Sequence, residues 1–215
     1  MGSEMCIRDR TTNYPLAVQK MFATVPALLT VTPIFKLTVT MVVKAAHVSR
    51  GSFYSHFQDI YDFIHAFEHA LIEQATVSKK VLNQGIQAAL VHPDPHNAYP
   101  TYLELTTNIN TQLASFQALL GPHGDPQFLD QLQAGLIDNL LATTEQAPLN
   151  HQYFQSIPAD YAMPIYFSGV LTIIQHWLTK PHPEPPEVVA NIIVQSRYTA
   201  AYHLFSDRPL GDDNN

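Results

Sequence analysis

Apolar residues recur along most of this chain at the three- and four-residue spacing of helices, and no stretch keeps up the strict alternation of a strand. Breaks rich in proline and glycine separate the periodic stretches. In the second half these stretches lie at about 97–120, 125–145, 151–180 and 185–205. Near the start, Pro26 predicts a kink or a break in a helix that closes at Pro33. The pattern predicts an all-α protein.

Two short helices are predicted in close succession over residues 38–57. Thr38 is a suitable N-cap for the first helix. The apolar positions that follow it at helical spacing are Val39, Val42, Val43 and Ala46. Ala45 and Ala46 are small enough to let a second helix cross steeply over the first. Such a crossing is the geometry of a helix-turn-helix.

The second helix, predicted over 50–57, has Ser49 as its cap and turns Phe53 and Phe57 inward. His47 falls in the turn, where a backbone with positive φ is needed and glycine is more usual. The remaining side chains form a small polar surface suited to DNA. The predicted contact residues are Thr38, Ser49, Arg50, Gly51, Ser52, Tyr54, Ser55 and His56.

This surface has the chemistry that DNA recognition uses. The Arg50 guanidinium can reach a guanine edge or a phosphate, and Ser and Tyr hydroxyls can hold phosphates. The alternative is that residues 38–57 form only a helical hairpin inside a bundle. A longer third helix, predicted from about Gln58 to Leu82, would lead from this head into the rest of the chain.

The charge of the chain is divided unevenly. Residues 1–57 contain six Lys or Arg and two acidic residues, whereas the remainder contains five basic and sixteen acidic residues. A basic head on an acidic body is typical of a DNA-binding protein that carries a separate non-DNA domain. The net charge of −7 for the whole chain conceals this division.

Composition argues against several classes of protein. The single cysteine, Cys6, excludes an intramolecular disulfide or a multi-cysteine zinc site. No apolar run is long enough for a membrane span, and residues 1–10 lack the apolar core of a secretion signal, so we expect a cytoplasmic protein without a membrane partner. His65 and His69 share a helical face, but no third ligand accompanies them. We therefore expect no metal site, no cofactor and no enzyme activity.

One segment of the head has a sequence pattern that resembles a known protein family. The stretch 37-LTVTMVVKAAHVSRGSFYSHFQDIYDFI-64 resembles the N-terminal signature of the TetR family of bacterial transcriptional regulators. In the body, 115-SFQALLGPHGDPQFLDQL-132 and 165-IYFSGVLTIIQHWLTK-180 resemble a low-GC Gram-positive branch of that family. Two departures are His47 in place of the turn glycine, and Gln58-Asp59-Ile60 where a phosphate-binding lysine is usual. The missing lysine predicts weaker DNA binding with a smaller salt dependence.

The resemblance implies a three-helix DNA-binding head joined to a larger helical body that binds a ligand and dimerises. We expect residues 1–10 to be a disordered or non-native start. A helix-turn-helix domain at 11–60, a ligand-binding and dimerisation domain at 61–207 and a disordered tail at 208–215 would follow. Candidate ligand contacts are Tyr99, Tyr102, Phe116, Phe128, Tyr153, Phe154 and Tyr161. Candidate dimer contacts are Ile165, Leu171, Ile174, Trp177, Leu178, Val189, Ile192 and Ile193.

The partners that follow are a double-stranded DNA operator, an unidentified small-molecule effector and a second copy of the chain. The resemblance implies a repressor that the effector releases from DNA. The alternative is a coactivator or partner-binding module of the same fold with weak or no DNA binding. Aromatic side chains in such a body, and apolar faces on its last helices, are also compatible with an ordinary internal core.

Overall fold

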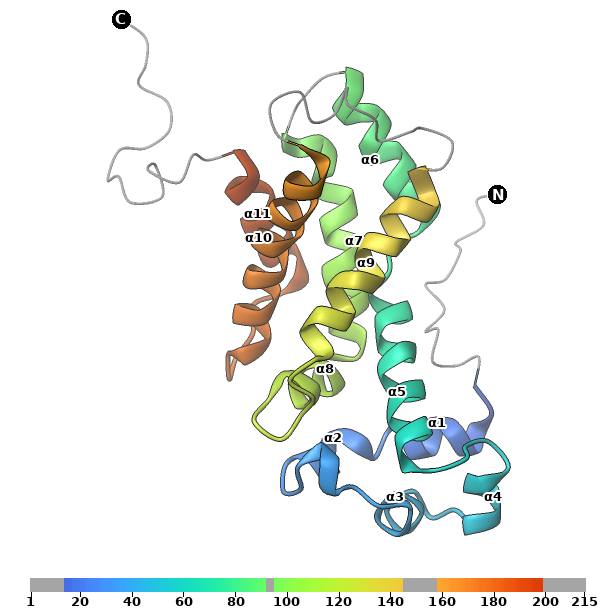
Figure 1. The fold of residues 1–215 in the computed structure, drawn as a ribbon. Coiled ribbons are helices and arrows are strands. Elements are labelled where there is room, and N and C mark those ends of the chain that lie inside the picture. The colour runs from blue at the N-terminus through green and yellow to red at the C-terminus, as the bar shows by residue number, and fades with distance from the viewer. Residues whose placement is uncertain (1–13, 92–94, 145–157, 199–215) are drawn as a thin grey trace, which may run out of the picture.

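The computed structural model describes residues 14–91, 95–144 and 158–198. Within these ranges all regular structure is helical, which confirms the all-α prediction. Figure 1 shows a small head formed by α1–α4 at one end of the molecule. Helix α5 leads away from the head, and α6–α11 form the larger body.

The head is a compact set of short helices around aromatic side chains. Its elements are α1 (Leu16–Phe22), α2 (Val25–Leu29), the 3-10 turn η2 (Ile34–Lys36), α3 (Val39–Ala46) and α4 (Arg50–Tyr54). The break predicted at Pro26 is present, with this proline in the first turn of α2 where its missing N–H costs no hydrogen bond. The ring of Phe22 lies 5.5 Å from that of Phe63 and 5.3 Å from that of Phe67, both on α5. These contacts fix the head to the helix that leads into the body.

The predicted helix from Gln58 to Leu82 is wrong in its length, because the structure has two helices there. Helix α5 (Ile60–Ala75) ends where Thr76 becomes extended, and α6 (Lys79–Val91) follows. Backbone N–H groups in the break donate to distant side chains: that of Val77 to Asn139 Oδ1 at 3.1 Å, and that of Ser78 to Glu104 Oε1 at 2.8 Å. The break is therefore held by residues of two other helices.

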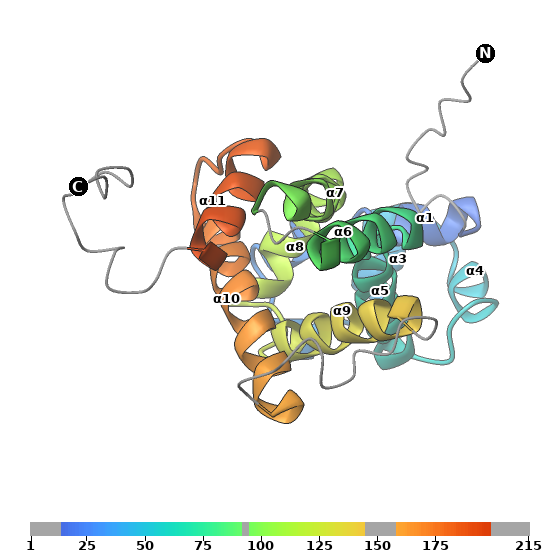
Figure 2. The ribbon, with the colours of Figure 1, turned by 90° about the horizontal axis from the view of Figure 1, so that it is seen from above.

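The body consists of helices that pack across one another. Its further elements are η3 (Pro95–Ala98), α7 (Tyr99–Thr111), α8 (Leu113–Leu120), α9 (Phe128–Thr144), α10 (Ala159–Thr179) and α11 (Pro186–Tyr198). Helix α11 packs along α7 and α10, and α5 packs between α7 and α9. Figure 2 shows α10 and α11 together at the edge of the body that lies away from α6.

The turn between α8 and α9 reaches down to the head. The backbone N–H of Ile34 donates to the carbonyl of His123 at 2.8 Å, and His123 Nδ1 lies 3.0 Å from the carbonyl oxygen of Leu29. Helix α2 also packs against α8. Head and body are thus joined at two places, through α5 and through this turn.

Candidate nucleic-acid interface

Helix α3 begins and ends on local signals that the sequence carries. The Thr38 hydroxyl accepts a hydrogen bond from the N–H of Met41 at 3.3 Å, which satisfies one unpaired donor of the first turn. His47 ends the helix in the left-handed region, with φ 53° and ψ 42°. This is the positive φ predicted for the turn, and it is the only one at a non-glycine residue in the described ranges. The N–H of Val48 then donates to the Val43 carbonyl at 3.0 Å and closes the turn.

Helix α4 is shorter than predicted. The Ser49 hydroxyl accepts a hydrogen bond from the N–H of Ser52 at 3.0 Å, as expected for its cap, but the helix ends at Tyr54 and not at residue 57. The chain must turn there to enter α5, where Asp59 in extended conformation caps the new helix through its carboxylate. The N–H groups of Tyr61 and Asp62 donate to Asp59 Oδ1 at 2.8 and 2.9 Å.

Two buried phenylalanines hold this pair of helices in place. Phe53 and Phe57 are buried, and their rings lie 5.4 Å apart. Both rings also contact Phe63 on α5. On α3, Ala46 is buried beneath the crossing, whereas Ala45 is exposed and takes no part in it. The inward face of the predicted helix-turn-helix is therefore formed largely by the residues that periodicity selected.

The predicted contact residues all lie on the outer side of the head. Seven of the eight are exposed and Ser52 is half-buried: Thr38, Ser49, Arg50, Gly51, Ser52, Tyr54, Ser55 and His56. The Tyr54 side chain is 56% exposed although it stands on the buried Phe53 ring. The contact with the buried Phe53 ring limits the movement of the exposed Tyr54 ring.

Arg50 has a contact that the sequence did not predict. Its Nη2 donates to the hydroxyl of Thr40 on α3 at 2.5 Å, so the guanidinium lies against the first helix of the pair. Thr40 is exposed and joins the candidate surface. The signal available in the sequence was weak, because a threonine two residues after a cap is ordinary for a helix start.

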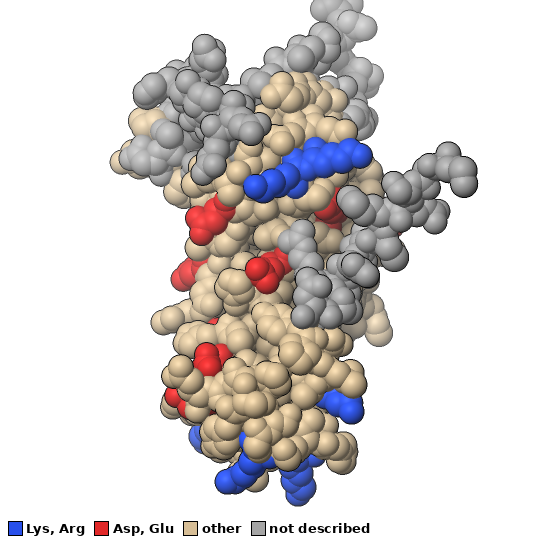
Figure 3. All heavy atoms as spheres, turned by 90° about the vertical axis from the view of Figure 1, so that its right-hand side faces the viewer, with Lys and Arg blue, Asp and Glu red and all other residues tan. Residues whose placement is uncertain are grey.

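The surroundings of this surface are positively charged. Residues 14–57 contain Lys20, Lys36, Lys44 and Arg50 and no acidic residue. Figure 3 shows Lys and Arg side chains projecting from the end of the molecule that carries the head, acidic side chains farther up, and a second group of basic side chains above those. The acids nearest in sequence, Asp59 and Asp62, both accept hydrogen bonds from backbone N–H groups at the start of α5. An acid-free end with projecting cations favours a polyanion.

Several aromatic residues predicted as ligand contacts have other surroundings in the structure. Phe116 and Phe128 are fully buried with their rings 6.0 Å apart, so they belong to the packed core. Tyr99 is half-buried against that core, and Tyr161 is 64% exposed. A ligand contact at Phe116, Phe128 or Tyr161 stays a prediction, because an aromatic residue on a helix can pack internally or face solvent as readily as line a cavity.

Among the candidates that the structure describes, Tyr102 is a residue that lines a pocket in the body. This pocket of about 60 Å³ lies among α6, α7, α9 and α10, and its wall is apolar apart from Thr101 and Asn139. In this conformation it holds less space than a one-ring molecule needs. The two remaining candidates, Tyr153 and Phe154, lie outside the described residues.

Most of the predicted dimer contacts are buried inside their own chain. Six side chains are in this position: Leu171, Ile174, Trp177, Leu178, Val189 and Ile193. Trp177 also donates its indole N–H to the Glu184 carbonyl at 2.9 Å. Helices α10 and α11 turn these six side chains toward the chain's own core, and their place in a dimer contact stays a prediction. Ile165 and Ile192 stay exposed, at 58% and 42%.

The described residues show neither a metal site nor a membrane span. His65 and His69 lie beside acidic side chains of the same helix, 3.7 Å from Glu68 and 3.8 Å from Glu73. Over the described ranges, no three His, Cys, Asp or Glu side chains come together as a metal site would need. Over the same ranges, none of the helices combines the length and the apolar character required to cross a bilayer.

Comparison with known proteins gives a family match for most of the body. Residues 96–197, from η3 to the end of α11, match a family model described as a transcriptional regulator C-terminal region. The head lies outside the matched range. No curated protein matches the chain, and no solved structure matches it.

Proposed function

Because residues 96–197, just under half of the chain, match a family model of the C-terminal region of TetR-type transcriptional regulators, we propose that the chain is a repressor whose head binds an operator and whose body binds a small-molecule effector. The effector would release the head from DNA. The proposed protein acts as a homodimer in the cytoplasm.

The observation that carries this proposal is the geometry of α3 and α4. Both helices are capped at their first residue by a side-chain hydroxyl, and both rest on buried aromatic and apolar residues. The polar side chains left outside stand on an end of the molecule without acidic residues between 14 and 57. A DNA-binding regulator uses a pair of helices of this kind to enter the major groove. The family model that matches the body is one of transcriptional regulators, which agrees with a DNA-binding head.

Arg50 and Tyr54 are the side chains best placed to contact DNA. Arg50 is exposed and its guanidinium is oriented by Thr40, so less freedom is lost on binding a base edge or a phosphate. Tyr54 is supported by Phe53 beneath it. We propose that both belong to the recognition helix.

A dimer would increase the affinity of a weakly basic head. Two heads on one frame read a palindrome with multiplied affinity. Exposed apolar side chains on the last two helices support a contact between two copies there: Tyr161, Ile165, Val188 and Ile192. The proposed contact surface keeps Ile165 and Ile192 from the predicted set and adds Tyr161 and Val188.

The effector site belongs to the body in this proposal. The small pocket beside Tyr102 has apolar walls and the polar groups of Thr101 and Asn139, a combination typical of small-molecule sites. Binding of an effector larger than a few atoms would require α6, α7 or α9 to move. Such a movement would reach α5, which packs on both α7 and α9 and carries the head.

The proposal is tested by measuring DNA binding of two variants and two matched controls. Arg50→Ala and Tyr54→Ala should each weaken binding to the region upstream of the chain's own gene by about tenfold or more, the loss expected for one good base or phosphate contact. Lys79→Ala and Tyr61→Ala remove exposed side chains of the same kinds outside the helix-turn-helix, and should bind as the parent does. Fluorescence anisotropy with a salt titration measures all five proteins, and circular dichroism checks their helical content.

A second candidate function is that of a coactivator or partner-binding module with little DNA binding. The observation that favours it is the start of α5, where Asp59 and Asp62 cap the helix at the place of the family's phosphate-binding lysine. Binding to the upstream region that is only micromolar and independent of sequence would support this function and count against a repressor. Specific nanomolar binding that falls with salt would support the repressor.

A further inference from the structure

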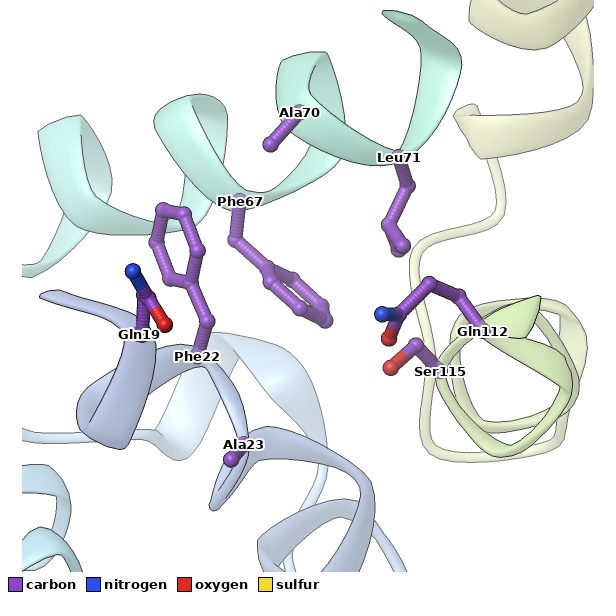
Figure 4. A pocket seen from close by; sticks show the side chains of 8 residues that line it. All are labelled: Gln19, Phe22, Ala23, Phe67, Ala70, Leu71, Gln112 and Ser115. Atoms are coloured by element: carbon purple, nitrogen blue, oxygen red, sulfur yellow. The ribbon is translucent and has the colours of Figure 1, made fainter. Parts of the chain in front are cut away.

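A pocket of about 210 Å³ lies between the head and the body, larger than the body pocket beside Tyr102. Figure 4 shows α1 on one side of it, α5 above it and the break between α7 and α8 on the other side. The lining side chains come from both parts of the molecule: Gln19, Phe22 and Ala23 from the head, and Phe67, Ala70, Leu71, Gln112 and Ser115 from the body.

Small side chains leave this space open. Ala23 and Ala70 contribute only methyl groups from opposite sides, where larger residues would fill the gap. The Phe22 and Phe67 rings, 5.3 Å apart, form an aromatic wall. Ala23 is exposed and stands at the mouth of the pocket, so a molecule has a route in from solvent.

Two of the polar side chains that line the pocket, Gln112 and Ser115, lie where α7 ends and α8 begins. Helix α7 ends at Gln112, with φ −123° and ψ 31°, and α8 starts directly after it. The Gln112 carbonyl accepts hydrogen bonds from the N–H groups of Ser115 and Phe116, at 2.9 and 3.1 Å. In Figure 4 the Gln112 amide and the Ser115 hydroxyl point toward the pocket from this break. On the head side, Gln19 holds its amide in place by donating to the Tyr14 carbonyl at 2.7 Å.

The chemistry of the lining defines the kind of ligand. The walls are aromatic and aliphatic, the polar groups are two amides and one hydroxyl, and no charged side chain lines the pocket. A charged molecule would lose its hydration without an opposite charge in return. A cavity of about 150 Å³ is enough for benzene, so this pocket accommodates one ring with a short polar substituent.

We propose that the pocket between head and body is a binding site for a neutral one-ring aromatic alcohol or amide. The ring would pack on Phe22, Phe67 and Leu71, and the polar substituent would bond to Ser115 and Gln112. The site is separate from the body pocket beside Tyr102. The proposal goes beyond the proposed function and does not depend on it, since it concerns a molecule that contacts both parts of the chain whether or not DNA is bound.

Benzyl alcohol is the test ligand, and toluene is its counterpart without the hydroxyl. Titration of the full chain, followed by NMR of its methyl groups, should show saturable binding of benzyl alcohol. The largest shifts are expected at the methyls of Ala23, Ala70 and Leu71. Ala23→Leu should weaken binding about tenfold or more by filling the mouth of the pocket. Ala27→Leu makes the same exchange at an exposed position of α2 that does not line the pocket, and should bind as the parent does.

A second variant tests the polar contact. Ser115→Ala should weaken benzyl alcohol about three- to tenfold, toward the affinity of toluene, and leave toluene unchanged, because one hydrogen bond is lost. The site would be overturned by an absence of saturable binding, by an Ala23→Leu variant that binds like the parent, or by shifts centred on Leu105 and Leu140 in the body pocket. Since DNA is absent from these measurements, their failure is distinct from a failure of the proposed function.

Discussion

Glu68 is a buried carboxyl group at the joint between head and body. It lies on α5, 1% exposed, and over the described residues neither carboxylate oxygen has a hydrogen-bond partner at normal distance. His65 Nδ1 is 3.7 Å from Oε2, and the polar neighbours from the other side are Asp125 and Gln131. Burial first, and then the negative charge of Asp125, raises the pKa of Glu68 to about 7. The folded protein therefore holds a proton there that the unfolded chain releases at lower pH.

The raised pKa predicts how stability changes with pH. The stabilising contribution of the proton is complete below the ordinary glutamate pKa and is lost as the pH rises through about 7. Glu68→Gln removes the charge that forms above that pH. It should raise the free energy of unfolding at pH 8.5 by about 1–2 kcal/mol, less than the whole shift implies because neighbouring polar groups screen the charge. At pH 5 it should have little effect.

Thermal unfolding at both pH values measures this difference. Glu73→Gln is the control, since Glu73 lies on the same helix with a side chain 54% exposed, and its pH profile should follow that of the parent. An equal gain for Glu68→Gln at pH 5 and pH 8.5 would contradict a role for the Glu68 charge.

At the scale of elements, the arrangement of α3 and α4 depends on how α3 ends. The His47 backbone adopts the left-handed conformation, which costs a residue with a Cβ about 1 kcal/mol relative to glycine. Burial of Val42, Val43 and Ala46 on α3, and of Phe53 on α4, holds the turn in this conformation. The turn is therefore a strained connection between two well-supported helices.

His47→Gly should relieve this strain. We expect an increase in the free energy of unfolding of about 0.5–1 kcal/mol, and a rise of about 1–4 °C in Tm for a chain of this size. His56→Gly places the same exchange at an exposed position without positive φ, where greater freedom of the unfolded chain should lower stability. Differential scanning calorimetry compares the two, and a loss of stability in His47→Gly would argue against strain at the turn.

At the scale of the whole molecule, α10 and α11 both cover the core of the chain and expose an apolar edge. Val189 and Ile193 point into the core, whereas Val188 and Ile192 on the same helix are 43% and 42% exposed. On α10, Ile165 is 58% exposed. One pair of helices thus carries two apolar faces, and among the described residues only the inner face is covered.

If two copies meet at the outer face, a charge there should separate them. Ile192→Glu should shift the protein from dimer to monomer, because an unpaired carboxylate would be buried in the contact. Leu16→Glu is the matched control, since Leu16 is 67% exposed on α1 and far from this face in sequence. Sedimentation velocity distinguishes the species, and a dimer that survives Ile192→Glu would place the contact elsewhere.

The sequence and the tertiary structure agree where the determining signals are local. Thr38 and Ser49 cap their helices and Pro26 lies in the first turn of one, because each of these effects involves atoms within about one turn. They differ where the signals are remote. The break after α5 is held by Asn139 and Glu104, residues 62 and 26 positions away from their backbone partners, and no periodicity reveals such contacts.

By itself the sequence determined the helical class, the place of helices α3 and α4 with the turn between them, and the polar residues on their outer side. Only the tertiary structure decided what each apolar face is buried against. Periodicity marks which side of a helix avoids water but does not identify the surface that covers it. For this reason Trp177 and Ile193, predicted at a dimer contact, lie in the core, whereas the pocket at Ala23 and Ser115 exists only because α1, α5 and the α7–α8 break meet.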